Sequence, residues 1–305
     1  MIKKCLCSGI LGLSLLMGTG TAFAGADLMP FYLASQGAGD VAAKVTDTKA
    51  KLTAAGFEVV GEYSPYAGTT IIVVTNDKLK SNAAKSGDDD ETFGGFGAAI
   101  RVGVTTVGGK VQVAYTNPVY MAHSYRMKDK LKSVEGQLKS AIGKAKAFGS
   151  EDGVEDEDLE DWHYMMGMPY FDEPEEVGKG SHAALVAKIE KNLAAKKAGA
   201  SKVFRIDIPG KQQVLFGVAL ANGDGADKTV MGEIDKGALR HSAHLPYGLL
   251  VSKGIAYTLQ GEYRIASSFP DLSMGQFMGI SSAPKAIVQT MEARSEERRV
   301  GKECR

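Results

Sequence analysis

Residues 51–75, KLTAAGFEVVGEYSPYAGTTIIVVT, decide the fold prediction because a helical pattern changes there into an extended one. Before this change, Val41, Val45 and Leu52 recur at helical spacing, and Thr48 shares their face. Asp40 is a candidate N-cap and Gly56 a stop signal. After the change, FEVVGEY and TTIIVVT are typical of strands joined by the turn SPYAG. The stretch therefore predicts a helix that leads into two strands.

A second pair of strands follows at residues 98–121, AAIRVGVTTVGGKVQVAYTNPVYM. Gly108 and Gly109 stand between two alternating runs, which is a strong hairpin signal. Taken with the preceding helix and strands, residues 40–121 resemble the domain-of-unknown-function family 302. That resemblance implies a small two-layer α/β fold, often secreted. It assigns no functional residue, since the family has no assigned activity known to us.

The same pattern recurs in the second half of the chain, at a displacement of roughly 140 residues. SHAALVAKIEKNLAAKKAG predicts a helix that Ser181 can cap, SKVFRIDI and QQVLFGVAL predict two strands, and PYGLLVS with IAYTLQGEYRIA predicts a hairpin. We therefore expect an α+β protein of two related two-layer α/β halves that arose by internal duplication. The alternative is that two unrelated α+β segments share this pattern by accident.

These patterns divide the chain into five segments. The middle segment combines an amphipathic helix with an acidic stretch and an aromatic one, and we expect Trp162, Tyr164, Tyr170 and Phe171 to pack across the junction of the halves. Residues 85–97, KSGDDDETFGGFG, predict an exposed loop. The predicted segments are a signal peptide (1–24), a first α/β half (25–125), a helical and acidic/aromatic connection (126–180), a second α/β half (181–293) and a terminal artefact (294–305).

The N-terminal segment has the features of a cleavable secretory signal peptide. Lys3 and Lys4 precede an apolar stretch, and Ala22, Phe23 and Ala24 form a cleavage site. Glycines, serines and threonines dilute the apolar stretch, which disfavours a transmembrane helix. We therefore expect a periplasmic protein without stable membrane insertion, the alternative being an uncleaved anchor.

The terminal segment, RSEERRVGKECR, can be encoded by the codons of a common short-read sequencing adapter. We expect an adapter-derived, disordered tail after Ala293, because the segment is highly charged and almost free of apolar residues. The whole chain has 36 basic and 36 acidic residues. Without the signal and the tail, 29 basic and 33 acidic residues and no cysteine remain. This mildly acidic balance disfavours nucleic-acid binding.

Several side chains have the donor types of metal ligands, but no metal or cofactor is predicted. His163, Met165, Met166 and Met168 could bind monovalent copper, yet methionines beside aromatic residues more often fill gaps in a core. His241 and His244 could share a helix face, but Pro246 favours a loop and hence ordinary surface or capping histidines. The acidic runs lack the alternating pattern of a calcium loop.

No catalytic motif is complete. Ser282 and Lys285 have the Ser-x-x-Lys spacing without its companion motifs, and TFGGFGAA lacks the end of a phosphate-binding loop. We therefore expect a non-enzymatic protein that binds a small molecule or a periplasmic protein partner in a cleft between the halves. The residues expected near this cleft are Tyr120, Arg126, His163 and Tyr170. The alternatives are an enzyme that uses His163 or His241 with a carboxylate, and a structural envelope-associated factor with a large exposed apolar patch.

Overall fold

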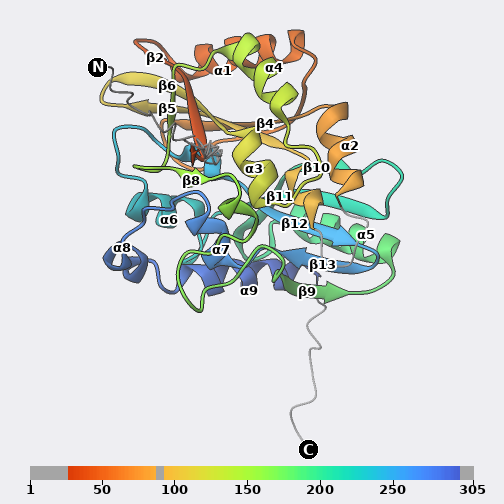
Figure 1. Cartoon of the computed structure of the whole chain (residues 1–305). Helices are drawn as coiled ribbons and strands as arrows, with labels where there is room; N and C mark the ends of the chain where they lie inside the picture. The colour runs from red at the N-terminus through yellow and green to blue at the C-terminus, as the bar shows by residue number, and fades with distance from the viewer. Residues whose placement is uncertain (1–26, 87–92, 296–305) are drawn as a thin grey trace, which may run out of the picture.

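The computed structural model describes residues 27–86 and 93–295. In the first half, six strands form one sheet in the order β3-β4-β5-β6-β2-β7. Figure 1 labels most of the elements along the chain. Those of the first half are β2 (Phe31–Gly37), α1 (Val41–Ala54), β3 (Glu58–Tyr63), β4 (Thr69–Thr75), α2 (Asp77–Lys85), η1 (Gly94–Gly97), β5 (Ile100–Val107), β6 (Lys110–Thr116), α3 (Pro118–Ser124), α4 (Lys132–Ile142) and β7 (Lys146–Phe148).

In the second half, five strands form a separate sheet in the order β10-β11-β12-β13-β9. Its elements are β9 (Glu175–Lys179), α5 (His182–Ala194), η3 (Lys197–Gly199), β10 (Ala200–Asp207), β11 (Gln213–Leu220), α6 (Asp227–Ile234), η4 (Ser242–His244), β12 (Tyr247–Ser252), β13 (Ile255–Thr258), α7 (Gly261–Ala266), α8 (Met274–Gly279) and α9 (Ala283–Ser295). Two short strands, β1 (Asp27–Leu28) and β8 (Val154–Glu155), pair with each other, and η2 (Asp158–Glu160) follows.

The two sheets have the same topology. Strands β3, β4, β5, β6 and β2 occupy the same order in the first sheet as β10, β11, β12, β13 and β9 in the second. Along the chain, each half runs strand, helix, two strands, helix, two strands, helix. The α+β class is confirmed. The shared topology is what an internal duplication would produce, and the duplication itself stays a prediction.

Local sequence signals explain why several of these elements form where they do. Asp40 caps α1, since its side chain accepts a hydrogen bond from the backbone nitrogen of Ala43 at 2.9 Å. Gly56 follows this helix with a φ of 84°, a left-handed conformation that favours glycine. Gly108 and Gly109 both have positive φ, which suits the tight turn between β5 and β6.

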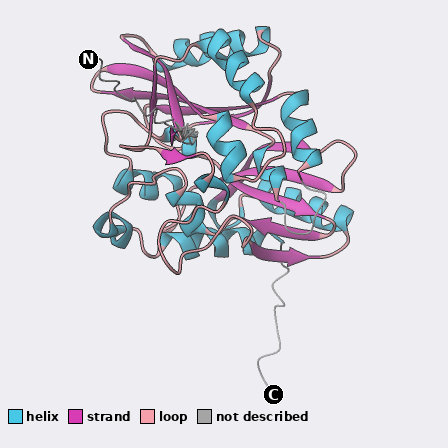
Figure 2. Cartoon of the chain, viewed as in Figure 1, coloured by secondary structure: helices cyan, strands magenta, loops and turns pink. Residues whose placement is uncertain are grey.

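Helices cover the outer sides of the two sheets. Helix α1 packs on β3, β4 and β5, whereas α5 and α9 pack on strands of the second sheet. Figure 2 shows helices on the upper and lower sides of the molecule with strands between them. One cluster of buried apolar side chains includes residues of both halves, such as Ile72 and Leu215. No helix of the described residues is long and apolar enough to cross a membrane.

Each half sends a short helical turn onto the sheet of the other half. The turn η1 precedes β5 and contacts β11 and β12, and η4 precedes β12 and contacts β4, β5 and β6. Residues Gly94 to Gly97 are buried, so the expected exposed loop is wrong for this part of residues 85–97. A Cβ atom on Gly95 would lie 2.9 Å from Leu250, which shows how closely η1 approaches β12. Residues 87–92 lie outside the described residues.

Two other sequence predictions need correction. The last hairpin strand ends at Thr258, and the following residues form α7. This helix is buried on most of its surface, so its residues do not show a helical period of apolar and polar positions. The predicted connection 126–180 also contributes to the sheets at both ends, because β7 pairs with β2 and β9 pairs with β13.

The C-terminal helix includes two residues of the predicted tail. Arg294 and Ser295 end α9 and are buried, and the side chain of Asn192 donates a hydrogen bond to the carbonyl oxygen of Arg294 at 2.6 Å. The expectation of disorder is therefore wrong for these two residues, which continue a helical face that contains Ile287 and Met291. Residues 296–305 and the predicted signal peptide lie outside the described residues, and the adapter origin stays a prediction.

Candidate functional site

One face of strand β5 points toward the second half. Arg101 Nε donates to the carbonyl oxygen of Pro246 at 3.2 Å, and Thr105 Oγ1 donates to Ser242 Oγ at 2.8 Å. Gly103 lies between them, and a Cβ atom there would lie 2.2 Å from Ser242 Oγ. Because side chains alternate along a strand, these three residues share the face that meets the η4 region.

Helices α3 and α7 lie beside this face and belong to different halves. Helix α3 begins where the side chain of Asn117 caps the backbone nitrogen of Val119 at 3.0 Å, with Pro118 in its first turn. The hydroxyl of Tyr263 in α7 donates to the carbonyl oxygen of Ser124 at the end of α3, at 2.8 Å. This hydrogen bond fixes the two helices against each other.

A pocket opens among these elements. Its empty space is about 360 Å³, a figure that includes the open mouth, and a molecule the size of water can place its centre in only about 20 Å³ of it. The enclosed part therefore holds little more than a water molecule, and a larger ligand would extend into the open mouth. The lining residues come from both halves and are Pro30, Phe31, Arg101, Thr116, Tyr120, Met121, Ser124, Tyr125, Ala243, Arg264, Ser267 and Ser268. We call it the junction pocket.

Two buried arginines line the junction pocket. Arg101 is 3% exposed and Arg264 is 6% exposed. Arg264 Nη1 donates to Ser268 Oγ at 2.7 Å and is 2.9 Å from His244 Nδ1, and its Nη2 donates to the carbonyl oxygen of His244. Within residues 27–86 and 93–295, neither arginine forms an ion pair with a carboxylate.

Burial, together with the two arginines, keeps the neighbouring His244 neutral. His244 is fully buried, and burial, followed by the positive charges of Arg264 and Arg101, lowers its pKa well below the usual value. Since Arg264 Nη1 can only donate, His244 Nδ1 accepts and the ring proton is on Nε2. The expectation of a surface or capping histidine is therefore wrong for His244.

Two hydroxyl groups of α3 are buried without a partner. Tyr120 and Ser124 line the junction pocket, and neither hydroxyl makes a hydrogen bond of good geometry among the described residues. The two hydroxyls are neighbours, since burial raises the pKa of Tyr120 and the Ser124 hydroxyl opposes this shift. A buried polar group that makes no hydrogen bond costs about 1–3 kcal/mol. A ligand that reaches these hydroxyls would supply the missing partners.

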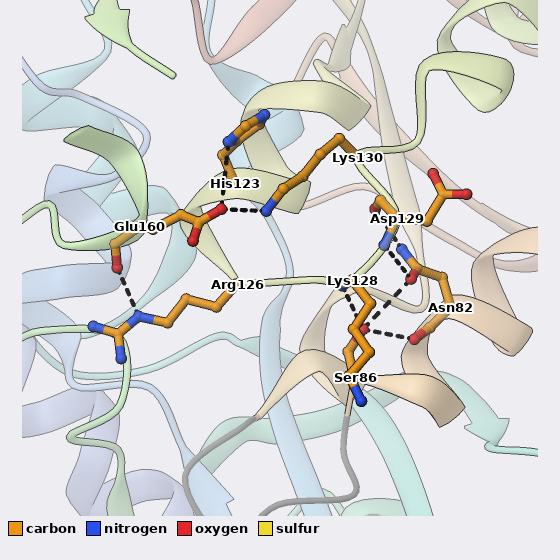
Figure 3. Close-up of polar contacts among 8 residues, drawn as sticks. All are labelled: Asn82, Ser86, His123, Arg126, Lys128, Asp129, Lys130 and Glu160. Carbon is orange, nitrogen blue, oxygen red and sulfur yellow. Dashed lines mark hydrogen bonds and ion pairs between the residues drawn. The ribbon is translucent and has the colours of Figure 1, made fainter. Parts of the chain in front are cut away.

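Of the four residues that the sequence predicted near a binding cleft, Tyr120 lies in the junction pocket. Arg126 lies just beyond α3 and is engaged elsewhere. Its Nε donates to the carbonyl oxygen of Glu160 at 2.6 Å, and its Nη1 pairs with Asp172 at 2.6 Å. Figure 3 shows Glu160 between Arg126 on one side and His123 with Lys130 on the other. Arg126 therefore anchors the connection segment to the end of α3.

The turn after α3 is held from its other side by helix α2. Asn82 Nδ2 donates to the carbonyl oxygen of Asp129 at 2.7 Å, and Ser86 Oγ accepts from the backbone nitrogen of Lys128 at 3.0 Å (Figure 3). These contacts, together with those of Arg126, fix the position of α3 and hence of Tyr120 and Ser124.

His163 and Tyr170 contact each other and do not line the junction pocket. Their ring centroids are 4.5 Å apart, and Tyr170 is 36% exposed. The neighbouring Phe171 instead packs across the junction as expected, 5.1 Å from the Tyr125 ring and 6.0 Å from the Tyr263 ring. The structure therefore does not bring the four predicted residues together at one site.

The other candidate chemistry is dispersed. Met166 is 96% exposed beside His163, and the described residues contain no group of three or more His, Cys, Asp or Glu side chains that could hold a metal ion. His241 shares a second pocket with Asp271, but the Asp271 carboxylate already accepts from Ser150 Oγ at 2.9 Å. Burial lowers the pKa of His241 to about 4.

Sequence reasoning missed Arg101 and Arg264, which contribute the charge of the junction pocket. Arg101 offered a signal, because it is a single charged residue between Ile100 and Val102 in an apolar strand. Arg264 offered no such signal, because the sequence predicts that residues 263–266 belong to a strand.

Comparison with known proteins identifies no relative of this chain. No protein-family model matches this chain, and no curated protein or solved structure is significantly similar to it.

Proposed function

We propose that this protein binds a small ligand in the junction pocket, and that it does so in the periplasm, as the predicted signal peptide implies. The observation that supports this function best is the set of buried polar groups from both halves that face one pocket. Arg101, Tyr120 and Ser124 come from the first half, and Arg264 comes from the second. Ligand sites are common where two structural units meet.

The energetic reason is the state of these groups without a ligand. Almost all buried polar groups in proteins have hydrogen-bond partners, yet Tyr120 OH and Ser124 Oγ have none among the described residues. A ligand that hydrogen-bonds to them would remove part of this cost. Binding would therefore add stability to the folded protein.

A second candidate, an acid–base enzyme, is favoured by the pocket that His241 and Asp271 share. The surroundings of His241 oppose it, because the ring stacks on Phe31 at 5.2 Å and Phe148 at 5.5 Å. A pKa of about 4 leaves this ring neutral and a weak base at neutral pH. The observations therefore favour ligand binding.

A screen with the purified protein tests the proposed function. Thermal unfolding is measured against small anionic, neutral and cationic metabolites and metal ions, and equilibrium dialysis verifies each hit. A ligand at 100 times its Kd adds about 2.7 kcal/mol and raises the Tm of a domain of this size by roughly 5–10 °C. At least one compound should give such a shift.

A pocket variant links any hit to the site. Ser124→Val removes the unpartnered hydroxyl and fills space in the junction pocket, so the shift should disappear. Ser140→Val, on helix α4 outside the pocket, should leave it intact. A complete lack of shifts, or shifts that Ser124→Val does not reduce, would exclude ligand binding in this pocket.

A further inference from the structure

We propose that the ligand of the junction pocket is a small oxyanion, such as a carboxylate or sulfate, held between Arg101 and Arg264. This inference rests on the proposed function and extends it by naming the chemical class of the ligand. It follows from the charge of the pocket, its hydrogen-bond donors and its size.

The charge of the pocket is positive and uncompensated. Arg101 and Arg264 both line it, and the groups that they contact are neutral: the carbonyl oxygen of Pro246, His244 and Ser268. Buried charges in proteins are paired or bind ions of opposite sign, because an isolated buried charge is costly. No carboxylate within residues 27–86 and 93–295 pairs with either arginine.

Arg101 stays charged at neutral pH. Burial, followed by the charge of Arg264, lowers the pKa of Arg101 to about 10, which leaves its guanidinium protonated. His244 is neutral and supplies no negative charge. A cation would be repelled by this pair of charges, and a neutral ligand would leave them unpaired.

The groups without a partner are mainly donors. Arg101 uses only Nε in a hydrogen bond, so its Nη1 and Nη2 have no hydrogen-bond partner among the described residues. The Tyr120 and Ser124 hydroxyls can donate as well. An oxyanion accepts hydrogen bonds only, and an arginine can donate two parallel ones to it. The narrow interior restricts the ligand to a small one that extends into the open mouth of the pocket.

Arginines can also serve as clamps for a loop, and both of these hold carbonyl oxygens next to η4, those of Pro246 and His244. A clamp accounts for these hydrogen bonds. It does not account for the unused Nη atoms of Arg101 or for two unpartnered hydroxyls in the same pocket. These groups are what the oxyanion would bind.

Calorimetric titration of the purified protein tests the charge of the ligand, at fixed chloride concentration. The probes are acetate, acetamide and sulfate, since acetate and acetamide have nearly the same shape and differ in charge. Acetate, sulfate or both should bind, with acetamide at least roughly 10-fold weaker than acetate if acetate binds. Equal binding of acetate and acetamide would overturn the oxyanion inference.

Variants locate the binding. Arg101→Gln and Arg264→Gln should each weaken oxyanion binding roughly 10- to 100-fold, the range expected for a lost charged hydrogen bond. Arg205→Gln is the matched control, because Arg205 lies at the surface in ion pairs with Asp207 and Glu190 and should leave affinity unchanged. Oxyanion binding that survives both pocket substitutions would overturn the inference.

A milder variant covers the case in which an arginine substitution prevents folding. Tyr120→Phe removes one unpartnered oxygen and should weaken the binding several-fold.

The proposed function and the oxyanion inference can fail separately. If neutral compounds bind, and Ser124→Val abolishes their binding, the proposed function stands and the oxyanion inference is overturned. If no compound of any charge binds, both fail.

Discussion

Arg101 occupies a position where the strand around it is otherwise apolar. Ile100 and Val102 are fully buried on the other face of β5, against the side that α1 covers. On the face that carries Arg101, the η4 region packs closely on Gly103, and Thr105 forms a hydrogen bond with it. The strand therefore places one charged side chain in the interior without disturbing the apolar core behind it.

Asp227 is another buried ionisable residue. It is the first residue of α6, and its Oδ2 accepts a hydrogen bond from Tyr63 OH at 2.9 Å. Burial raises the pKa of this carboxyl group from 3.8 to about 7, although the Tyr63 hydrogen bond opposes the shift. The folded protein therefore holds this proton more tightly than the unfolded chain.

This proton makes stability depend on pH. A raised folded-state pKa means that the contribution of Asp227 is fully present below about pH 4 and is lost as the pH rises through about 7. The full loss corresponds to about 4 kcal/mol. Asp227→Asn keeps an acceptor for Tyr63 and cannot ionise, so its free energy of unfolding should increasingly exceed that of the wild type as the pH rises.

Urea unfolding between pH 4.5 and pH 8.5 measures this difference. Asp224→Asn, at an exposed position of the preceding loop, should leave the pH profile unchanged. Parallel profiles for the wild type and Asp227→Asn would show that Asp227 is not protonated in the folded protein near neutral pH.

At the scale of elements, the closest approach of the two sheets is between strands β3 and β10. Both are edge strands, and both carry an irregularity in their pairing, at Val59/Gly61 and at Lys202/Phe204. A Cβ atom on Gly61 would lie 2.5 Å from the carbonyl oxygen of Val203 and 2.9 Å from Phe204 Cβ. Gly61 therefore permits a contact between backbones that a side chain would prevent.

Substitution of Gly61 tests the importance of this contact. Gly61→Ala should lower the free energy of unfolding by about 1–3 kcal/mol, because the opposing group is backbone and cannot rotate away. Gly136→Ala is the matched control within α4, where no atom lies within 4 Å of an added Cβ, and it should raise that free energy by about 0.5–1 kcal/mol. Urea unfolding gives both values. A neutral Gly61→Ala would mean that β3 and β10 are not in close contact.

Elements with a strong local signal could be predicted from the sequence. Helix α1 has a cap, an apolar face and a glycine stop. The hairpin turn at Gly108 and Gly109 lies where the sequence predicts it. Helices α2, α3, α6 and α7 were missed. All four are short, and α3 and α7 are buried on most of their surface, so no helical period identifies these two. Asn76 before α2 and Asn117 with Pro118 at α3 were start signals that the sequence prediction overlooked.

At the scale of the molecule, the junction pocket lies between two corresponding helices, α3 and α7. Tyr120 is the third residue of α3 and Tyr263 is the third residue of α7. Tyr263 OH donates to the carbonyl oxygen of Ser124, whereas Tyr120 OH has no partner among the described residues. The two halves therefore differ at the pocket. The fourth residue is Met121 in α3 and Arg264 in α7.

This arrangement explains why the candidate site was only partly predictable. The sequence indicated a site at the junction of the halves and included Tyr120. It could not indicate that Arg101 and Arg264, far apart along the chain, line one pocket, because that depends on how η4 packs across β5. The residue types of Arg126, His163 and Tyr170 suit a binding site, but tertiary contacts direct these side chains elsewhere.

Anomalous diffraction from crystals grown with selenate tests the central claim most directly. Selenate has the shape and charge of sulfate, and its selenium atom marks the position of the anion. The structure predicts a strong anomalous peak in the junction pocket, with selenate oxygens within hydrogen-bond distance of Arg101 and Arg264. If calorimetry shows that the protein binds sulfate, a pocket without a selenium peak, in crystals whose selenate is bound only at the surface, would contradict the claim.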